Sequence, residues 1–142
     1  LYKDSEQIIK ESVYEGASVV ADSIKSGLKS LPVDNGQGTE DKMLTGVSRR
    51  QKADLIDAFG LAPIENNGDY INTKAGFDGY GQTKSKKYPK GLPNALLMRS
   101  VESGTSFRKK TPVIRSAVNK SRKAAVEAMD KKMEEACTEL MD

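Results

Sequence analysis

An apolar stripe near the N-terminus is the feature that most restricts the fold of this chain. Between positions 4 and 31, apolar side chains recur at spacings of three or four: Ile9, Val13, Ala17, Val20, Ile24, Leu28 and Leu31. This spacing predicts one long amphipathic helix. Pro32 is expected to end it, because a proline ring disfavours helical angles at the residue before it. Gly16 and Gly27 are expected to weaken the helix slightly.

A second long helix is predicted at the other end of the chain. Thr111-Pro112 reads as an N-cap followed by a proline in the first helical position. A broad face of small and apolar residues follows, made of Val113, Ala117, Val118, Ala124, Ala125, Ala128, Met129, Met133, Ala136 and Leu140. Charge runs from basic at the start to acidic at the end, which opposes the helix dipole. Such a pattern fits a helix with a partner, and it also fits neutral drift.

Shorter elements are predicted between the two helices. Ser48 to Phe59 reads as a compact helix with a capping box, since Gln51 follows Ser48 by three residues, and Gly60 is expected to be a left-handed stop. Asn67-Gly68 predicts a β-hairpin. Its second strand is expected to place Ile71, Thr73, Ala75 and Phe77 on one face. Asn94 to Ser103 reads as a helix that ends at Gly104.

The expected fold class is therefore α+β. A small antiparallel sheet, with its hairpin at Asn67-Gly68, would be packed by the long N-terminal and C-terminal helices. The length of 142 residues suits a single domain over 1–142. Glycine and proline punctuation, with many polar residues, predicts mobile loops at about 33–46 and 79–92. With 37% hydrophobic residues, the chain suits a domain that completes its burial against a partner.

The charge is strongly clustered, although the net charge is only +3. From Lys74 to Lys123 there are 13 lysine and arginine residues against two acidic ones, Asp78 and Glu102. The remainder of the chain is net acidic. Interleaved with Tyr80, Tyr88 and Phe107, these cations could neutralise phosphates and stack on bases. A solvated loop, or a surface that meets an acidic patch on a neighbouring subunit, explains the same pattern.

Catalysis has little support in the sequence. The chain has no histidine, so the commonest general base and metal ligand is missing. Ser26 and Lys29 match a bare Ser-x-x-Lys spacing without any companion motif. Cys137 is the one cysteine, which excludes an internal disulfide. We expect no enzyme activity, no cofactor and no metal. No apolar run approaches the roughly 18 residues of a membrane span, so a soluble intracellular product with no membrane partner is expected.

Two stretches resemble a family of small neck proteins of long-tailed double-stranded DNA bacteriophages and prophages. These are head–tail joining, head–tail connector or tail-completion minor tail proteins. The resemblance spans residues 50 to 117, about half of the chain, and is carried by VESGTS at 101–106 and TPVIRSA at 111–117. The family pattern is a glutamate-x-glycine-threonine turn, then a proline and an arginine that open the last helix. This chain has Val113 where phenylalanine is common and Ser116 where proline is common.

The resemblance implies a non-enzymatic structural protein of the virion, part of a ring at the head–tail junction. Its partners would be copies of itself and neighbouring neck, portal-side and tail-tube proteins, with packaged DNA passing through the lumen. Before assembly it would lie in the host bacterial cytoplasm. The motif positions Glu102, Gly104, Thr105 and Pro112 would be fold determinants.

The basic stretch supplies candidate residues for the interface or the DNA path. These are Lys84, Lys86, Lys87, Lys90, Arg99, Arg108, Lys109, Lys110 and Arg115. The four lysines would face either the DNA path or an acidic neighbour. The first competing hypothesis is a free DNA-binding module that uses residues 74–123, and the second is an enzyme.

Overall fold

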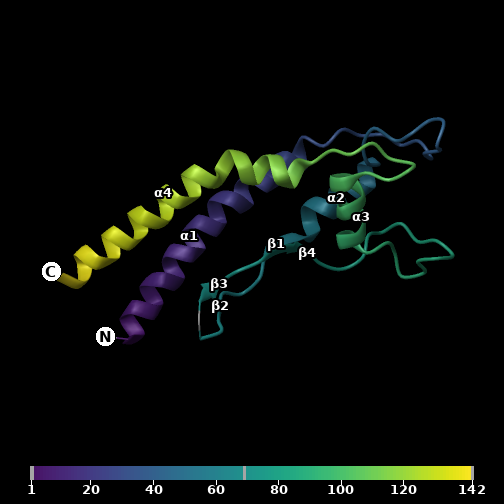
Figure 1. Ribbon diagram of the computed structural model, residues 1–142. Helices are drawn as coiled ribbons and strands as arrows, with labels where there is room; N and C mark the ends of the chain where they lie inside the picture. The colour runs from purple at the N-terminus through teal and green to yellow at the C-terminus, as the bar shows by residue number, and fades with distance from the viewer. Residues whose placement is uncertain (1, 69, 142) are drawn as a thin grey trace.

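The computed structural model describes residues 2–68 and 70–141 of the chain (Figure 1). Its fold class is α+β, as expected from the sequence. The elements in chain order are α1 (Tyr2–Lys29), α2 (Arg49–Ala58), β1 (Phe59–Leu61), β2 (Glu65–Asn66), β3 (Ile71–Asn72), β4 (Ala75–Phe77), α3 (Asn94–Ser103) and α4 (Val113–Met141).

The long helices α1 and α4 lie side by side in an antiparallel pair (Figure 1). Two serines of α1 fix their register. The Ser12 hydroxyl donates to the Met129 carbonyl at 3.0 Å, and the Ser23 hydroxyl donates to the Ala117 carbonyl at 3.1 Å. The later part of the apolar stripe of α1, with Ile24, Leu28 and Leu31, belongs to the buried core, whereas Ile9 near its start is exposed. As predicted, α1 ends before Pro32.

The two glycines of α1 lie where α4 comes closest. A Cβ on Gly16 would lie 2.5 Å from Cγ of Met129, and one on Gly27 would lie 2.7 Å from Cγ1 of Val113. Real Cβ atoms do not approach other atoms so closely. The weaker helix propensity of these positions is thus offset by closer packing between the helices, which the sequence alone does not reveal.

Helix α2 begins as predicted and ends differently. The Ser48 hydroxyl accepts a hydrogen bond from the N–H of Gln51, and the Gln51 side chain accepts one from the N–H of Ser48, both at 3.1 Å. The expected left-handed stop at Gly60 is wrong. Phe59 caps α2 in an extended conformation, with φ −74° and ψ 134°, so the chain passes directly into β1.

The sheet is one β-hairpin interrupted in its middle. Strands β1 and β4 pair with Phe59 opposite Phe77, and β2 and β3 pair with Glu65 opposite Asn72. Between the β1–β4 pair and the β2–β3 pair, one side of the hairpin has three residues, 62–64, and the other has two, 73–74. The pairing register of the two strand pairs therefore differs by one residue. Pro63 lies in the longer side and has no N–H for a ladder bond. The prediction that Ile71 to Phe77 form one continuous second strand is therefore wrong.

The predicted turn lies at the tip of this hairpin. Asn66 pairs with Ile71, so residues 67–70 form the loop, and Asp69 lies outside the described residues. The Asn66 side chain accepts a hydrogen bond from the N–H of Gly68 at 3.0 Å. Gly68 has φ +94°, a conformation that glycine adopts without the steric cost of a Cβ.

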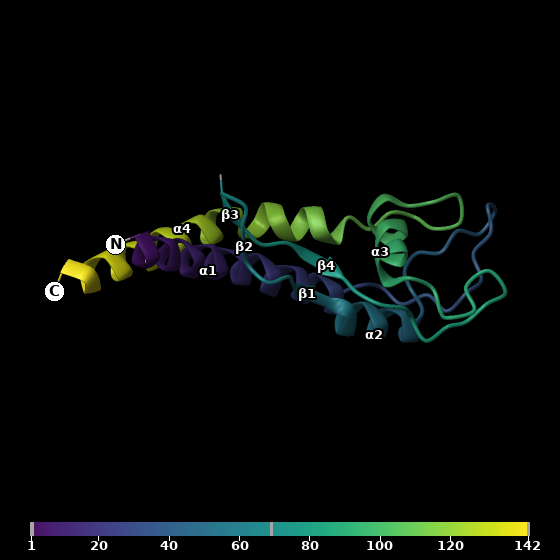
Figure 2. The same ribbon diagram turned by 90° about the horizontal axis from the view of Figure 1, so that it is seen from below.

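The core lies between α1, α2, α3, the start of α4 and the base of the hairpin. Its most completely buried apolar side chains are Leu28, Leu55, Val47 and Val101. Phe59 and Phe77 join the hairpin to this core, with ring centroids 5.3 Å apart. The base of the hairpin is therefore anchored, while its tip extends along α1 (Figures 1 and 2).

Candidate functional site

Three loops gather at the end of the molecule opposite to both termini (Figures 1 and 2). They join α1 to α2 (residues 30–48), β4 to α3 (residues 78–93) and α3 to α4 (residues 104–112). We call this region the loop end. It contains most of the candidate residues that the sequence suggested.

The joint between α3 and α4 is built from the motif residues. Gly104 ends α3 with φ +79°, and its N–H donates to the Ser100 carbonyl at 2.8 Å. Thr105 then closes a tight turn, since its hydroxyl accepts from the N–H of Phe107 at 3.1 Å. The turn returns the chain to α3, where the N–H of Thr111 donates to the Val101 carbonyl at 2.7 Å.

Glu102 caps the helix that follows it. One carboxylate oxygen accepts from the N–H of Ile114 at 2.8 Å, and the other accepts from the N–H of Arg115 at 2.9 Å. Both amides belong to the first turn of α4, where the helix dipole favours a negative charge. The sequence predicted a cap from Thr111 and Pro112 in the first helical position. Instead α4 begins at Val113, one residue later, and the capping carboxylate comes from α3.

The first and third loops are bonded to each other through the backbone. The N–H of Leu44 donates to the Phe107 carbonyl at 2.7 Å, and the N–H of Lys109 donates to the Leu44 carbonyl at 2.8 Å. These two bonds form a short parallel bridge between segments that are more than 60 residues apart in the chain. The mobility expected for residues 33–46 stays a prediction, although Leu44 in this segment is hydrogen-bonded to the third loop.

Asp34 organises the first loop. Its carboxylate accepts from the N–H of Gly36 at 2.9 Å, and from the N–H and hydroxyl of Thr45 at 3.0 and 3.3 Å. The backbone hydrogen bonds from Thr45 and Gly36 lower the pKa of this carboxyl below its ordinary value. Because the ionised form accepts all three bonds, Asp34 holds the two ends of the loop together.

Arg108 lies inside the loop end, although the sequence placed it among the interface cations. It is buried, with 8% of its surface exposed, and Nη1 donates to the Gly46 carbonyl. Burial lowers the pKa of its guanidinium, and the negative charge of Asp34 partly opposes that change. In the isolated chain, Arg108 is therefore a buried hydrogen-bond donor inside the loop end and not a free surface cation.

The other cations lie on the surface. Lys84, Lys86, Lys87 and Lys90 are all exposed on the loop of residues 79–92, which we call the lysine loop. Arg99, Lys109, Lys110 and Arg115 are exposed on α3, the third loop and α4. Among the side chains of residues 5–68 and 70–140, the one ion pair within 4.0 Å joins Lys10 to Glu6, so none of these cations has a carboxylate partner among them.

The lysine loop is closed at its base and has a local turn. The N–H of Gly81 donates to the Leu92 carbonyl at 2.7 Å, and the N–H of Asn94 donates to the Gly79 carbonyl at 3.0 Å. Asp54, a buried carboxylate on α2, accepts from the N–H of Gln82 at 3.0 Å. The mobility expected for 79–92 therefore stays a prediction for the exposed part of the loop.

A groove runs between the three loops and α3. It encloses about 880 Å³ and has an apolar surface with cations around it. The exposed fraction of the residue is 51% for Phe107 and 42% for Leu96. Lys87 and Arg99 line the groove, and no aspartate or glutamate is among its lining residues. The lining residues are Gln37, Gly38, Leu44, Lys87, Tyr88, Leu92, Leu96, Leu97, Arg99, Ser100, Ser103, Gly104, Thr105, Ser106, Phe107 and Arg108.

Sequence reasoning identified the cations of this groove and missed its apolar surface. Leu44 lies in a segment without periodicity, and Leu96 is one of several apolar residues in ALLMRSVES. Only the folded arrangement shows that Leu44 and Leu96 line the same space as Phe107. The structure thus brings Lys87 and Arg99 together around one groove, while the rest of the lysine loop extends into solvent.

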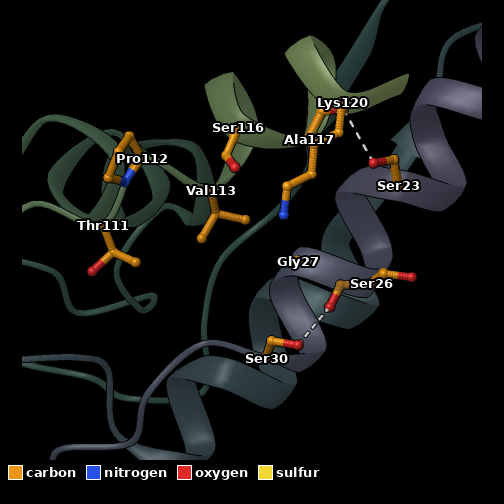
Figure 3. A pocket seen from close by; sticks show the side chains of 10 residues that line it. All are labelled: Ser23, Ser26, Gly27, Ser30, Thr111, Pro112, Val113, Ser116, Ala117 and Lys120. Atoms are coloured by element: carbon orange, nitrogen blue, oxygen red, sulfur yellow. Dashed lines mark hydrogen bonds between the residues drawn. The ribbon is translucent and has the colours of Figure 1, made fainter. Parts of the chain in front are cut away.

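A second cavity lies between α1 and the start of α4 (Figure 3). It encloses about 460 Å³ and is lined mainly by small and hydroxyl-bearing residues. The Ser23 hydroxyl donates to the Ala117 carbonyl, and the Ser30 hydroxyl donates to the Ser26 carbonyl at 3.1 Å. Lys120 is the charged residue of the lining. No aspartate or glutamate is among its lining residues.

Among residues 2–68 and 70–141, no three His, Cys, Asp or Glu side chains gather closely enough to hold a metal ion. Over the same residues, no helix combines the length and the apolar character that crossing a membrane requires.

Comparisons of this chain with protein-family models, with curated proteins and with solved structures give no match.

Proposed function

We propose that this chain is a structural virion protein of a tailed bacteriophage, a ring subunit at the head–tail junction. It would act as a neck connector or as a tail-completion protein. The observation that carries the proposal is the joint between α3 and α4. Glu102, Gly104 and Thr105 carry the resemblance to phage neck proteins, and they form one hydrogen-bonded unit that starts α4 just after Pro112.

The distribution of charge supports an assembling subunit. The loop end carries exposed lysines with no carboxylate partner among the described side chains, whereas the far end of α4 is rich in glutamate. A surface of one sign at one end and of the opposite sign at the other favours contacts in which different surfaces meet. Such heterologous contacts close into rings when the rotation between subunits allows it.

The lysine loop supports a role in assembly or along the DNA path. Its lysines have no carboxylate partners within the described chain, and the loop itself projects from the folded body (Figure 2). We propose that they face either the packaged DNA or an acidic neighbour in the neck. Portal-side and tail-tube proteins would be the neighbours, and the virion would be the final location.

Charge reversal tests this proposal. The variant with Lys84, Lys86, Lys87 and Lys90 all changed to Glu should fail to form rings or to attach tails to heads. A matched control carries the same charge change on exposed helical positions outside the basic stretch, at Lys25, Lys29, Arg50 and Lys131. Normal assembly by the lysine-loop variant would contradict the proposal. Failure of both variants would trace the loss to net charge and would also contradict it.

A second candidate function is a DNA-binding module built on the same stretch. The observation that favours it is that Tyr80 is 60% exposed near the unpaired lysines of the loop, as stacking on bases requires. If it holds, the monomer binds duplex DNA with an affinity that falls steeply as salt rises. The slope against salt would drop in the four-lysine variant and would not drop in the helical control.

A further inference from the structure

The groove at the loop end has the surface of a site that another protein covers. Phe107 and Leu96 are about half exposed there, and Leu44 and Leu92 continue the apolar surface. Lys87 and Arg99 border it with no carboxylate in the lining. Apolar residues surrounded by charges of one sign fit an apolar side chain of a partner that is flanked by the opposite charge.

The C-terminal end of α4 has that complementary character. Leu140 is 59% exposed, and Glu134, Glu135 and Glu139 are exposed around it. With about 3.6 residues per turn, Glu134 and Glu139 fall on opposite flanks of Leu140. Carboxylates at the C-terminal end of a helix oppose its dipole, so nearby cations would stabilise this end.

One chain cannot bring these two surfaces together. The groove lies at the loop end, and the end of α4 lies at the opposite end of an elongated molecule (Figures 1 and 2). The antiparallel pairing of α1 and α4 fixes this separation, since Ser12 is bonded to the Met129 carbonyl and Ser23 to the Ala117 carbonyl. The contact can therefore form only between two molecules.

We propose that the groove binds the C-terminal turns of α4 from a second copy of this chain. Leu140 of one copy lies against Leu96 and Phe107 of the next, while Glu134 and Glu139 face Lys87 and Arg99. The contact joins two different surfaces, so it repeats from copy to copy. The contact itself needs only this chain. Its closure into a ring rests on the proposed function.

A charge swap tests the contact. The groove variant carries Lys87→Glu and Arg99→Glu, and the tail variant carries Glu134→Lys and Glu139→Lys. The weight-average mass of the wild-type chain, measured by light scattering, should rise with concentration. Each variant alone should need at least about tenfold more protein to reach the same mass. A tenfold change corresponds to a loss of about 1.4 kcal/mol in the free energy of association. An equimolar mixture should recover association, because each wild-type surface and each reversed surface then meets a complementary one.

The outcomes separate this inference from the proposed function. A wild-type chain that stays monomeric at every concentration overturns the inference, and so do variants that associate as well as wild type. A mixture that fails to recover association, when circular dichroism shows both variants folded, also overturns it. Recovered association without any binding to portal or tail-tube proteins supports the contact and contradicts the neck function. If the groove variant forms rings with those partners, the neck function is supported and the proposed contact is contradicted.

Discussion

The carboxylate of Glu102 accepts a hydrogen bond from the backbone N–H of Ile114 at 2.8 Å, so a side chain at the end of one helix caps the next. Its second oxygen binds the N–H of Arg115 at 2.9 Å. Nine residues, 104–112, join α3 to α4. The cap therefore fixes both where α4 starts and how the third loop is presented at the loop end.

Glu102→Ala should lower the free energy of unfolding by about 1–2 kcal/mol, the usual cost of losing an N-cap acceptor. Glu102→Gln should cost less, because an amide oxygen still accepts one of the two bonds. Urea unfolding followed by circular dichroism measures both. Glu127→Ala, at an exposed position on the same helix, is the control and should change stability by less than about 0.5 kcal/mol. Equal effects at Glu102 and Glu127 would contradict the capping role.

Gly46→Ala should be strongly destabilising. A Cβ at Gly46 would lie 2.0 Å from the carbonyl oxygen of Pro32, and a backbone atom cannot move aside as the tip of a side chain can. We expect a loss of about 1–3 kcal/mol in unfolding free energy. Gly60→Ala is the matched control, since a Cβ there meets nothing within 4 Å. Gly60→Ala should be neutral or slightly stabilising, and a similar loss for both variants would contradict the close packing of Pro32 on Gly46.

Arg108→Ala should destabilise the loop end, because the Gly46 carbonyl then loses its buried donor. Leaving a buried acceptor without a partner costs about 1–3 kcal/mol. Lys109→Ala and Lys110→Ala should stay within about 0.5 kcal/mol of wild type, since both side chains are exposed. Thermal or urea unfolding of the three variants distinguishes the buried cation from its two neighbours. If Arg108→Ala leaves the free energy of unfolding unchanged, the internal role is contradicted and Arg108 returns to the surface candidates.

Acid should loosen the first loop through Asp34. The pKa of its carboxyl is lower in the folded chain than its ordinary value of 3.8, so the ionised form favours the folded loop. That contribution is present above pH 3.8 and is lost as the pH falls through the lowered folded-state pKa. The protection of the Gly36 and Thr45 amides against hydrogen exchange, measured relative to the unfolded chain at the same pH, should therefore fall below that pH in wild type. In Asp34→Asn this fall in protection should be absent.

Local signals predicted much of the helical structure. The capping box at Ser48 and Gln51 and the positive φ at Gly104 involve residues within a few positions of each other, so the sequence pattern determines them. The hairpin tip beside Asn67-Gly68 follows from the same kind of short-range preference. The start of α4 was missed by one residue, because the acceptor that caps it comes from Glu102 rather than from Thr111.

Contacts between distant segments could not be predicted. Gly16 appears in the sequence as a weak point of a helix, and only the pairing with Met129 shows why a side chain would not fit. Arg108 appears as one cation among many, and only the carbonyl of Gly46 gives it an internal role. The groove has the same origin, since Leu44 and Leu96 become neighbours of Phe107 only after the loops fold together.

The mass of the purified chain by light scattering, alone and with portal and tail-tube proteins added, is the direct test of the neck function. We expect a ring of fixed stoichiometry, formed either by the chain alone or only with those partners. The four-lysine variant should fail to form it under the same conditions. A persistent monomer that ignores both partners and binds duplex DNA would contradict the neck function and would favour the DNA-binding module.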